Sequence, residues 1–242
     1  MKQELKGIFF DIDDTLYSTT IFAEKARRSA IQAMIELGLK GAPEALYQEL
    51  IEVTQEFEPN YGFHFNKLLD RLPKEASSHC NPAILVAGAV ISYHDRKFRE
   101  LALFPDAPPF LEKLSQTNLI RGIITSGLAI KQSEKILRLG LLKYLSGQEA
   151  IIISDQVGIN KPNPKLFQKA LDRFGLAPSE TAYVGDNPKK DILPCQQLGI
   201  RTIWMDRGGK HSILEPSIKP DYRVESFLEV EEILKKWGVN LP

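Results

Sequence analysis

Four short polar stretches hold the residues of this sequence whose types and spacing could carry chemistry. Each follows a run of apolar residues that is typical of a buried strand. The stretches are Asp11-Ile12-Asp13-Asp14-Thr15, Thr125-Ser126-Gly127, Lys161 in GINKPNPKLF, and Asp186 with Asp191 in YVGDNPKKD. Carboxylates this close together repel one another and are costly to bury, so a nearby positive charge is expected.

A group of aspartates with one lysine suits a metal ion and a phosphoryl group. Asp11, Asp186 and Asp191 offer the hard oxygen ligands that Mg²⁺ prefers, and the ion would offset their repulsion. Lys161 would add a second positive charge. Phosphoryl transfer needs mostly positioning and electrostatic stabilisation. One carboxylate could attack phosphorus and form an aspartyl phosphate, while a second carboxyl protonates the leaving oxygen and later activates water.

The elements that must position these residues follow an alternating pattern. Five apolar segments are predicted as buried strands, namely Ile8–Phe10, Gly122–Ile124, Ala150–Ile153, Ala182–Gly185 and Thr202–Met205. Helical patterns lie between or after them, at 131–139, 163–174 and 226–237. Such alternation predicts a parallel sheet covered on both faces. Ligands bind outside the carboxyl ends of the strands in an open parallel sheet, so the four polar stretches could converge there.

The alternation stops between about Ser18 and Leu101, where no segment is typical of a strand. Helical spacing, capping residues and glycines predict four helices in this part, so it forms an all-helical insert. The Pro-rich segment Leu103–Phe110 then returns the chain to the sheet. We therefore predict a catalytic core of residues 1–17 and 102–242, and a helical domain of residues 18–101.

Composition limits the classes of partner. The 242 residues include 31 Lys and Arg and 31 Asp and Glu, so no net charge draws nucleic acid or an anionic membrane. The longest apolar run, Ala83–Ile91, is far shorter than the ~20 residues of a membrane-spanning helix. The start lacks a signal peptide, and Cys80 and Cys195 form no CxxC pair. We predict a cytoplasmic protein without nucleic-acid or membrane partners, whose oligomeric state the sequence does not indicate.

The four stretches match in order and spacing the four motifs of the haloacid dehalogenase-like (HAD) hydrolase superfamily, which this sequence resembles. The helical insert after the first motif is similar to the C1-type cap of its subfamily I. Within the insert, YGFHFNKLLDRL and AGAVISYHDRKF resemble the cap of hydrolases near N-acylneuraminate-9-phosphatase. The resemblance implies an α/β fold with a Rossmann-like three-layer core, a parallel sheet and an inserted helical cap.

The resemblance also implies catalytic roles. Asp11 is the nucleophile and a Mg²⁺ ligand, and Asp13 is the general acid/base, whose backbone carbonyl also binds the metal. Thr125 and Lys161 hold the phosphoryl oxygens. With other anions nearby, we expect the pKa of Asp13 to rise enough for it to hold a proton for the leaving oxygen.

Four further positions complete the motifs. Asp186 is implied as a Mg²⁺ ligand, and Asp191 supports the metal directly or through water, although an acid in a first helical turn also suits the macrodipole. Ser126 is a candidate substrate contact at a position where many members have Asn. Asp14 has no catalytic counterpart and is interpreted as a turn or cap carboxylate.

Polar residues of the insert are candidates for recognising the substrate. They are His64, Asn66, His94 and Lys97. His94 and Lys97 share a helix face at i and i+3, which a solvated polar cluster explains equally well.

The sequence thus predicts a Mg²⁺-dependent phosphatase for a small phosphorylated metabolite of the sugar phosphate type, with a nucleoside monophosphate phosphatase (5′-nucleotidase) as the alternative. A 2-haloacid dehalogenase is less favoured, because that branch needs no metal and lacks an acid at the position of Asp13. A phosphomutase could use the same aspartyl phosphate. A binding protein without turnover would not need the full set of acids and Lys161.

Overall fold

The structure is a computed structural model that describes residues 4–57, 61–209 and 211–242, without the side chains at 97 and 98. The chain forms two compact units. One consists of the chain up to Thr19 together with Ala102–Pro242, and the other of Thr20–Leu101. Each is described below by itself.

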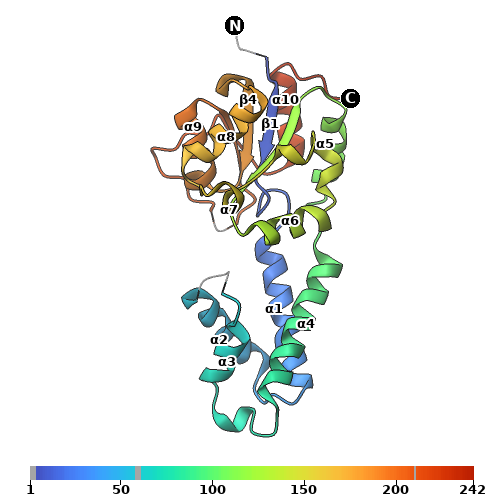
Figure 1. The fold of residues 1–242 in the computed structure, drawn as a ribbon, viewed down its shortest axis with the longest axis vertical. Coiled ribbons are helices and arrows are strands. Elements are labelled where there is room, and N and C mark those ends of the chain that lie inside the picture. Colours follow the sequence, from blue (N-terminus) through green and yellow to red (C-terminus); the bar gives the residue numbers. More distant parts are fainter. Residues whose placement is uncertain (1–3, 58–60, 210) are drawn as a thin grey trace. The chain divides into compact units, whose positions relative to one another are not determined.

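The first unit is built on a six-stranded sheet in the order β3-β2-β1-β4-β5-β6, and all its strand pairs are parallel (Figure 1). The strands are β1 (Gly7–Phe10), β2 (Ile120–Thr125), β3 (Ile151–Ile153), β4 (Thr181–Gly185), β5 (Arg201–Met205) and β6 (Tyr222–Val224). Strand β1 lies at the centre, between β2 and β4. The carboxyl ends of these three strands therefore meet beside Asp11, which directly follows β1.

Helices cover both faces of this sheet, as two neighbouring residues of β1 illustrate. Phe9 packs in the cluster of buried residues that includes Phe167 of α8. Phe10 points to the other face, where its ring lies 6.2 Å from Phe110 of α5 and 6.3 Å from Phe227 of α10. The helices of this unit are α5 (Ala107–Ser115), α6 (Ala129–Arg138), α7 (Ser154–Val157), α8 (Pro164–Phe174), α9 (Leu193–Leu198) and α10 (Phe227–Lys236). The three-layer α/β fold is confirmed.

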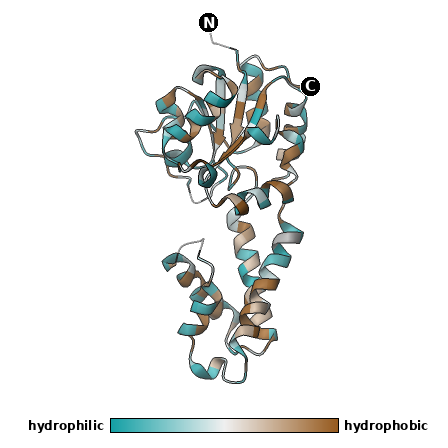
Figure 2. Ribbon diagram, in the orientation of Figure 1, coloured by the Kyte–Doolittle hydropathy of each residue, from teal (hydrophilic) through white to brown (hydrophobic). Residues whose placement is uncertain are grey.

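Polarity follows this layering. Hydrophobic residues run along the strands, whereas α8 carries both hydrophilic and hydrophobic residues (Figure 2). All four residues of β1 and all five of β4 are buried. Their apolar runs therefore lack the alternation of a half-exposed strand.

The second unit is helical throughout the part that the structure describes. It contains most of α1 (Thr19–Glu36), with α2 (Pro43–Glu56), α3 (His64–Arg71) and α4 (Pro82–Glu100). A core of its own includes Met34 of α1, Leu50 of α2, Leu68 of α3 and Leu85 of α4. The four predicted helices of the insert are confirmed.

Local signals located most strands and α-helices, but the short helices α7 and α9 were not predicted. Asn163 caps α8 by accepting a hydrogen bond from Lys165 N, and Gly175 ends this helix, as predicted. Strand β6 was missed, and so was α5, which begins inside the Pro-rich segment. Pro108 lies in the first turn of α5, where a missing N–H costs nothing.

Among the described residues, no helix combines the length and apolar character that crossing a membrane requires.

Candidate active site

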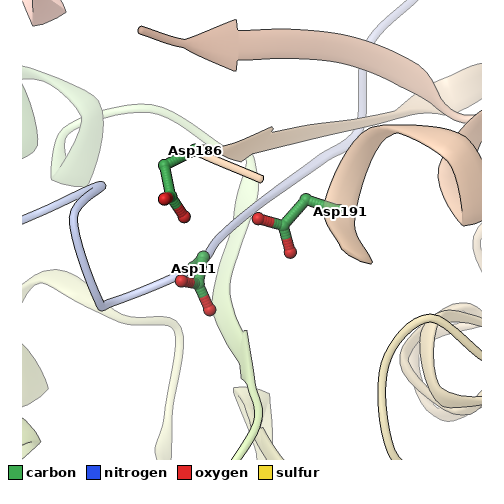
Figure 3. A group of neighbouring side chains, drawn as sticks. All are labelled: Asp11, Asp186 and Asp191. Atoms are coloured by element: carbon green, nitrogen blue, oxygen red, sulfur yellow. The ribbon is translucent and has the colours of Figure 1, made fainter. Parts of the chain in front are cut away.

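Three of the predicted acids meet at the carboxyl end of the sheet. Asp11 follows β1, Asp186 follows β4, and Asp191 lies in the turn of π-helix η5 (Pro188–Ile192). Their side chains point toward one another (Figure 3). One carboxylate oxygen from each lies within 4.8 Å of the others. The sequence predicted this group from motifs that lie far apart in the chain.

Lys161 is the cation of this group. Its ammonium donates to Asp11 Oδ1 and to Asp191 Oδ1, each at 2.7 Å. Burial disfavours the charged lysine, but the two carboxylates outweigh burial and raise the pKa of Lys161 above its ordinary value. The positive charge of one ammonium thus acts on three closely spaced carboxylates.

The carboxylates remain short of positive charge. Burial, which the neighbouring Lys161 only partly offsets, raises the pKa of Asp11 to about 7. Burial and the charges of Asp191 and Asp11 raise the pKa of Asp186 to about 9. Three close carboxylate oxygens are a donor set that suits Mg²⁺, and its charge would relieve this repulsion.

The backbone around Asp191 is shaped to hold its carboxylate against β4. The Asn187 N–H donates to Asp191 Oδ2 at 3.0 Å, and the Asn187 side chain caps the amides of Lys189 and Lys190. Gly185 leaves the necessary space, because a Cβ there would lie 2.6 Å from Asp191 Oδ2. Any larger residue at 185 would displace this acid.

Two hydroxyl residues stand at the carboxyl end of β2, where Thr125 is the last residue of the strand and Ser126 follows it. Thr125 is 1% exposed, and its hydroxyl has no hydrogen-bond partner among the described residues. A buried hydroxyl without a partner is costly, so a ligand oxygen would satisfy it. Ser126 accepts a hydrogen bond from the backbone N–H of Lys161 at 3.4 Å, which connects this loop to the lysine loop.

Asp13 belongs to a separate group, which we call the Asp13 cradle: Tyr17, Gln132 and Lys135. The Lys135 ammonium lies 2.7 Å from both carboxylate oxygens of Asp13. The Tyr17 hydroxyl donates to Oδ1 at 2.6 Å, and the Gln132 amide donates to Oδ2 at 3.3 Å. Both oxygens of Asp13 are therefore occupied by donors.

The expected rise in the pKa of Asp13 is wrong for this arrangement. Burial raises the pKa of Asp13, but the charge and hydrogen bonds of Lys135, with those of Tyr17 and Gln132, outweigh it. The pKa therefore lies below the ordinary value. The prediction considered only the anions next to Asp13 in the chain, whereas the deciding cation lies 122 residues away.

Asp14 has the structural role that was predicted. Its backbone is left-handed, with φ of 56°, and its carboxylate accepts a hydrogen bond from the Thr19 N–H at 2.8 Å. Asp14 thus caps the start of α1.

Four residues of the site were missed from the sequence. Gln132 and Lys135 lie at i and i+3 on α6, soon after the Thr125-Ser126-Gly127 stretch, and the sequence does not indicate which face of this helix meets Asp13. Tyr17 follows Asp13 by four residues. Tyr183 accepts a hydrogen bond from Lys161 at 2.7 Å, but a tyrosine within an apolar strand is typical of core packing and gave no signal.

The predicted substrate contacts of the insert all lie in the second compact unit. His64 and Asn66 belong to α3. His94 and Lys97 belong to α4, and the side chain of Lys97 lies outside the described part. Their role remains a prediction.

Comparisons with known proteins agree with this site. A model of the family described as haloacid dehalogenase-like hydrolase matches residues 8–205. The glyceraldehyde 3-phosphate phosphatase of Methanopyrus kandleri is 40% identical over 237 residues, which cover 96% of this chain and 98% of that protein. The phosphoserine phosphatase of Thermus thermophilus is 37% identical over 249 residues, covering 93% and 98%.

A solved structure shares the fold. The HAD phosphatase from Thermococcus onnurineus superposes with a TM-score of 0.64 at 24% identity, covering 95% of this chain and 98% of that one.

Proposed function

This chain belongs to the haloacid dehalogenase-like hydrolase family, and we propose that it is a Mg²⁺-dependent phosphatase that hydrolyses glyceraldehyde 3-phosphate or a sugar phosphate of similar size. The observation that carries the proposal is the convergence of Asp11, Asp186 and Asp191 on Lys161. Such a site combines a carboxylate nucleophile with cationic groups for a phosphoryl dianion.

In this proposal Asp11 attacks phosphorus and forms an aspartyl phosphate. Asp13 transfers a proton to the leaving alcohol oxygen, and it must first bind that proton, because its cradle favours the carboxylate. Asp13 then takes a proton from the water that hydrolyses the aspartyl phosphate. Asp13 must exchange part of its cradle for the leaving oxygen, since both of its oxygens are already hydrogen-bonded. Once it carries no proton, Lys135 favours the carboxylate that acts as base.

The side chains of Thr125 and Lys161 would hold the phosphoryl oxygens. Thr125 offers its unpartnered hydroxyl, and Lys161 offers its charge. Ser126, next to both, is a candidate third contact. Asp11, Asp186 and Asp191, with the backbone carbonyl of Asp13, would hold Mg²⁺, whose charge offsets that of the carboxylates and the phosphoryl group.

Two observations bear on the substrate. Five relatives in different archaea bear the name glyceraldehyde 3-phosphate phosphatase and are 38–43% identical to this chain. The phosphoserine phosphatase relative, at 37% over 93% of the chain, makes phosphoserine the second candidate. Both compounds are small monoesters made inside cells, so we place the reaction in the cytoplasm.

The helical unit is proposed to act as the cap that selects the leaving group. If so, changing His64, Asn66, His94 or Lys97 to Ala should alter the relative rates of natural substrates. p-Nitrophenyl phosphate should be affected much less, because its leaving group needs little assistance. Equal losses on every substrate would assign these residues to folding or to the catalytic core.

Phosphate release from four compounds tests the function: glyceraldehyde 3-phosphate, phosphoserine, a nucleoside 5′-monophosphate and p-nitrophenyl phosphate. We expect the highest kcat/KM with glyceraldehyde 3-phosphate, loss of activity in EDTA and recovery with Mg²⁺. Ca²⁺ should inhibit, since it prefers more ligands and longer bonds. Full activity in EDTA, or halide release from a 2-haloacid, would contradict the proposal.

A further inference from the structure

One buried hydroxyl contacts both sides of the phosphoryl-binding site. Tyr183 of β4 donates a hydrogen bond to the backbone oxygen of Ile124 at 2.8 Å and accepts one from Lys161 Nζ at 2.7 Å. Ile124 directly precedes Thr125 in β2. We propose that Tyr183 is a positioning residue that fixes the Lys161 ammonium relative to the carboxyl end of β2, an inference that rests on the proposed phosphatase function.

The directions of these hydrogen bonds follow from the number of protons available. The Lys161 ammonium has three protons and three acceptors, which are Asp11, Asp191 and the Tyr183 oxygen. The hydroxyl has a single proton to give. Asp191 Oδ1 is 3.5 Å from the hydroxyl and the Ile124 oxygen only 2.8 Å, so the proton goes to the backbone.

Tyr183 differs from the other two acceptors of Lys161 in what the reaction does to it. Asp11 becomes phosphorylated in the proposed reaction, and Asp191 belongs to the carboxylate group proposed to hold Mg²⁺. The Tyr183 hydroxyl takes no part in the proposed reaction, and it gives its single proton to the Ile124 backbone oxygen. It is therefore the acceptor that can hold Lys161 in place while the carboxylates change partners.

The aromatic ring is itself held rigidly, so the hydroxyl has a fixed position. Tyr183 is 1% exposed and pairs with Phe9 of β1 on one side and Thr202 of β5 on the other. Its ring meets that of Phe167 edge-on, at 5.0 Å and 85°. Tyr183→Phe keeps this packing and removes only the hydroxyl.

The test compares Tyr183→Phe with Tyr144→Phe, in saturating Mg²⁺. Tyr144 is another buried tyrosine of the same unit, on the short helix η2 (Leu141–Tyr144), and belongs to no part of the site described above. We measure kcat and KM with p-nitrophenyl phosphate and glyceraldehyde 3-phosphate, and the affinity for orthovanadate.

A hydroxyl that positions Lys161 acts on the phosphoryl side and not on the leaving group. We therefore expect Tyr183→Phe to lower kcat/KM about tenfold on both substrates and to weaken vanadate binding about tenfold, as the loss of one hydrogen bond to a charged group implies. Tyr144→Phe should stay within about twofold of the natural protein. In a Lys161→Met background, Tyr183→Phe should weaken vanadate binding by less than about twofold, because it acts through the lysine.

Several results would overturn the inference. Equal behaviour of the two variants would do so, as would a full tenfold loss of vanadate affinity in the Lys161→Met background. A Tyr183→Phe protein that fails to fold by circular dichroism would assign the hydroxyl to stability instead. If the natural protein hydrolyses p-nitrophenyl phosphate, these results leave the proposed function intact. A natural protein inactive on every phosphate monoester would overturn both.

Discussion

Asp11 and Asp13 are two positions apart in the chain, and their surroundings are opposite. Asp11 shares one ammonium with Asp191 beside a third carboxylate, and burial there raises its pKa to about 7. Asp13 has Lys135 to itself, with two further donors, and its pKa is lowered. The number of cations for each carboxylate thus decides the charge state of Asp11 and of Asp13. The closeness of the two residues in the sequence does not.

The Asp11 group and the Asp13 cradle therefore differ in whether they need further positive charge. The Asp11 group lacks positive charge. The binding of a metal ion and of a phosphoryl-bearing substrate would change the charge balance of this group. The Asp13 cradle is already neutralised by its own lysine and needs no ion. In the proposed reaction, Asp11 would therefore act as a nucleophile that depends on a metal ion, and Asp13 as a base whose charge the protein itself maintains.

The largest expected effect is that of removing the proposed nucleophile. Asp11→Asn should lower turnover of every phosphate monoester by at least about 10⁴-fold, because no covalent intermediate can form. Rapid-quench experiments with ³²P-labelled substrate should detect no phosphoenzyme. Labelled Asp11→Asn protein would show that another residue is the nucleophile and would remove the basis of the comparison.

Asp13→Asn should give a smaller loss that depends on the leaving group. We expect natural substrates to slow by about 10²–10⁴-fold, the usual contribution of general acid–base catalysis. p-Nitrophenolate leaves without a proton, so phosphorylation of Asp11 by p-nitrophenyl phosphate should be impaired less. Phosphoenzyme should then accumulate, since the attacking water lacks its base. Unchanged turnover of a natural substrate would contradict the role of Asp13.

Lys135→Met should have a smaller effect and lower turnover by about 10–100-fold. This substitution leaves the carboxylate of Asp13 in place but removes the cation beside it. The pKa of Asp13 should rise without Lys135, so the acidic limb of the pH profile for hydrolysis of the phosphoenzyme should move to higher pH. Lys135→Arg keeps the charge and should restore part of the rate.

The matched control for Lys135→Met is Lys169→Met, because Lys169 is an exposed lysine of α8. A pH profile identical to that of the natural protein in Lys135→Met would show that Lys135 only supports the fold.

The sequence predicted one side of this comparison better than the other. Asp11, Asp186 and Lys161 were located because each follows an apolar strand, and parallel strands bring their carboxyl ends together. The Asp13 cradle depends on which face of α6 turns toward the first loop, and periodicity does not determine that. Gln132 and Lys135 were therefore expected only as residues of a helix.

The fold shows the same limit. Strands β1 and β4 are buried on both faces and have continuous apolar sequences, so they were predicted. Strand β6 has only three residues at the sheet edge, and Arg223 within it is exposed. Its short mixed sequence carries no periodic signal, and only pairing with β5 makes it a strand.

The smallest effect is one on stability, and it measures the charge deficit of the Asp11 group directly. The raised pKa values of Asp11 and Asp186 mean that the folded, metal-free protein holds protons that the unfolded chain releases near 3.8, the ordinary pKa of an aspartate. This contribution is fully present below that value and is lost as pH rises through about 7 and about 9. The metal-free core should therefore become less stable across this range.

Mg²⁺ bound to these carboxylates would take the place of the protons, so its stabilising effect should grow with pH. Thermal unfolding in EDTA and in Mg²⁺ at pH 6, 7, 8 and 9 should show a widening gap in Tm, by about 2–4 °C for each kcal/mol. Asp186→Asn should flatten the decline in EDTA, whereas Asp70→Asn, an exposed acid of α3, should not. A gap that is constant with pH in the natural protein would mean that the Asp11 group is not short of positive charge, and the contrast with the Asp13 cradle would disappear.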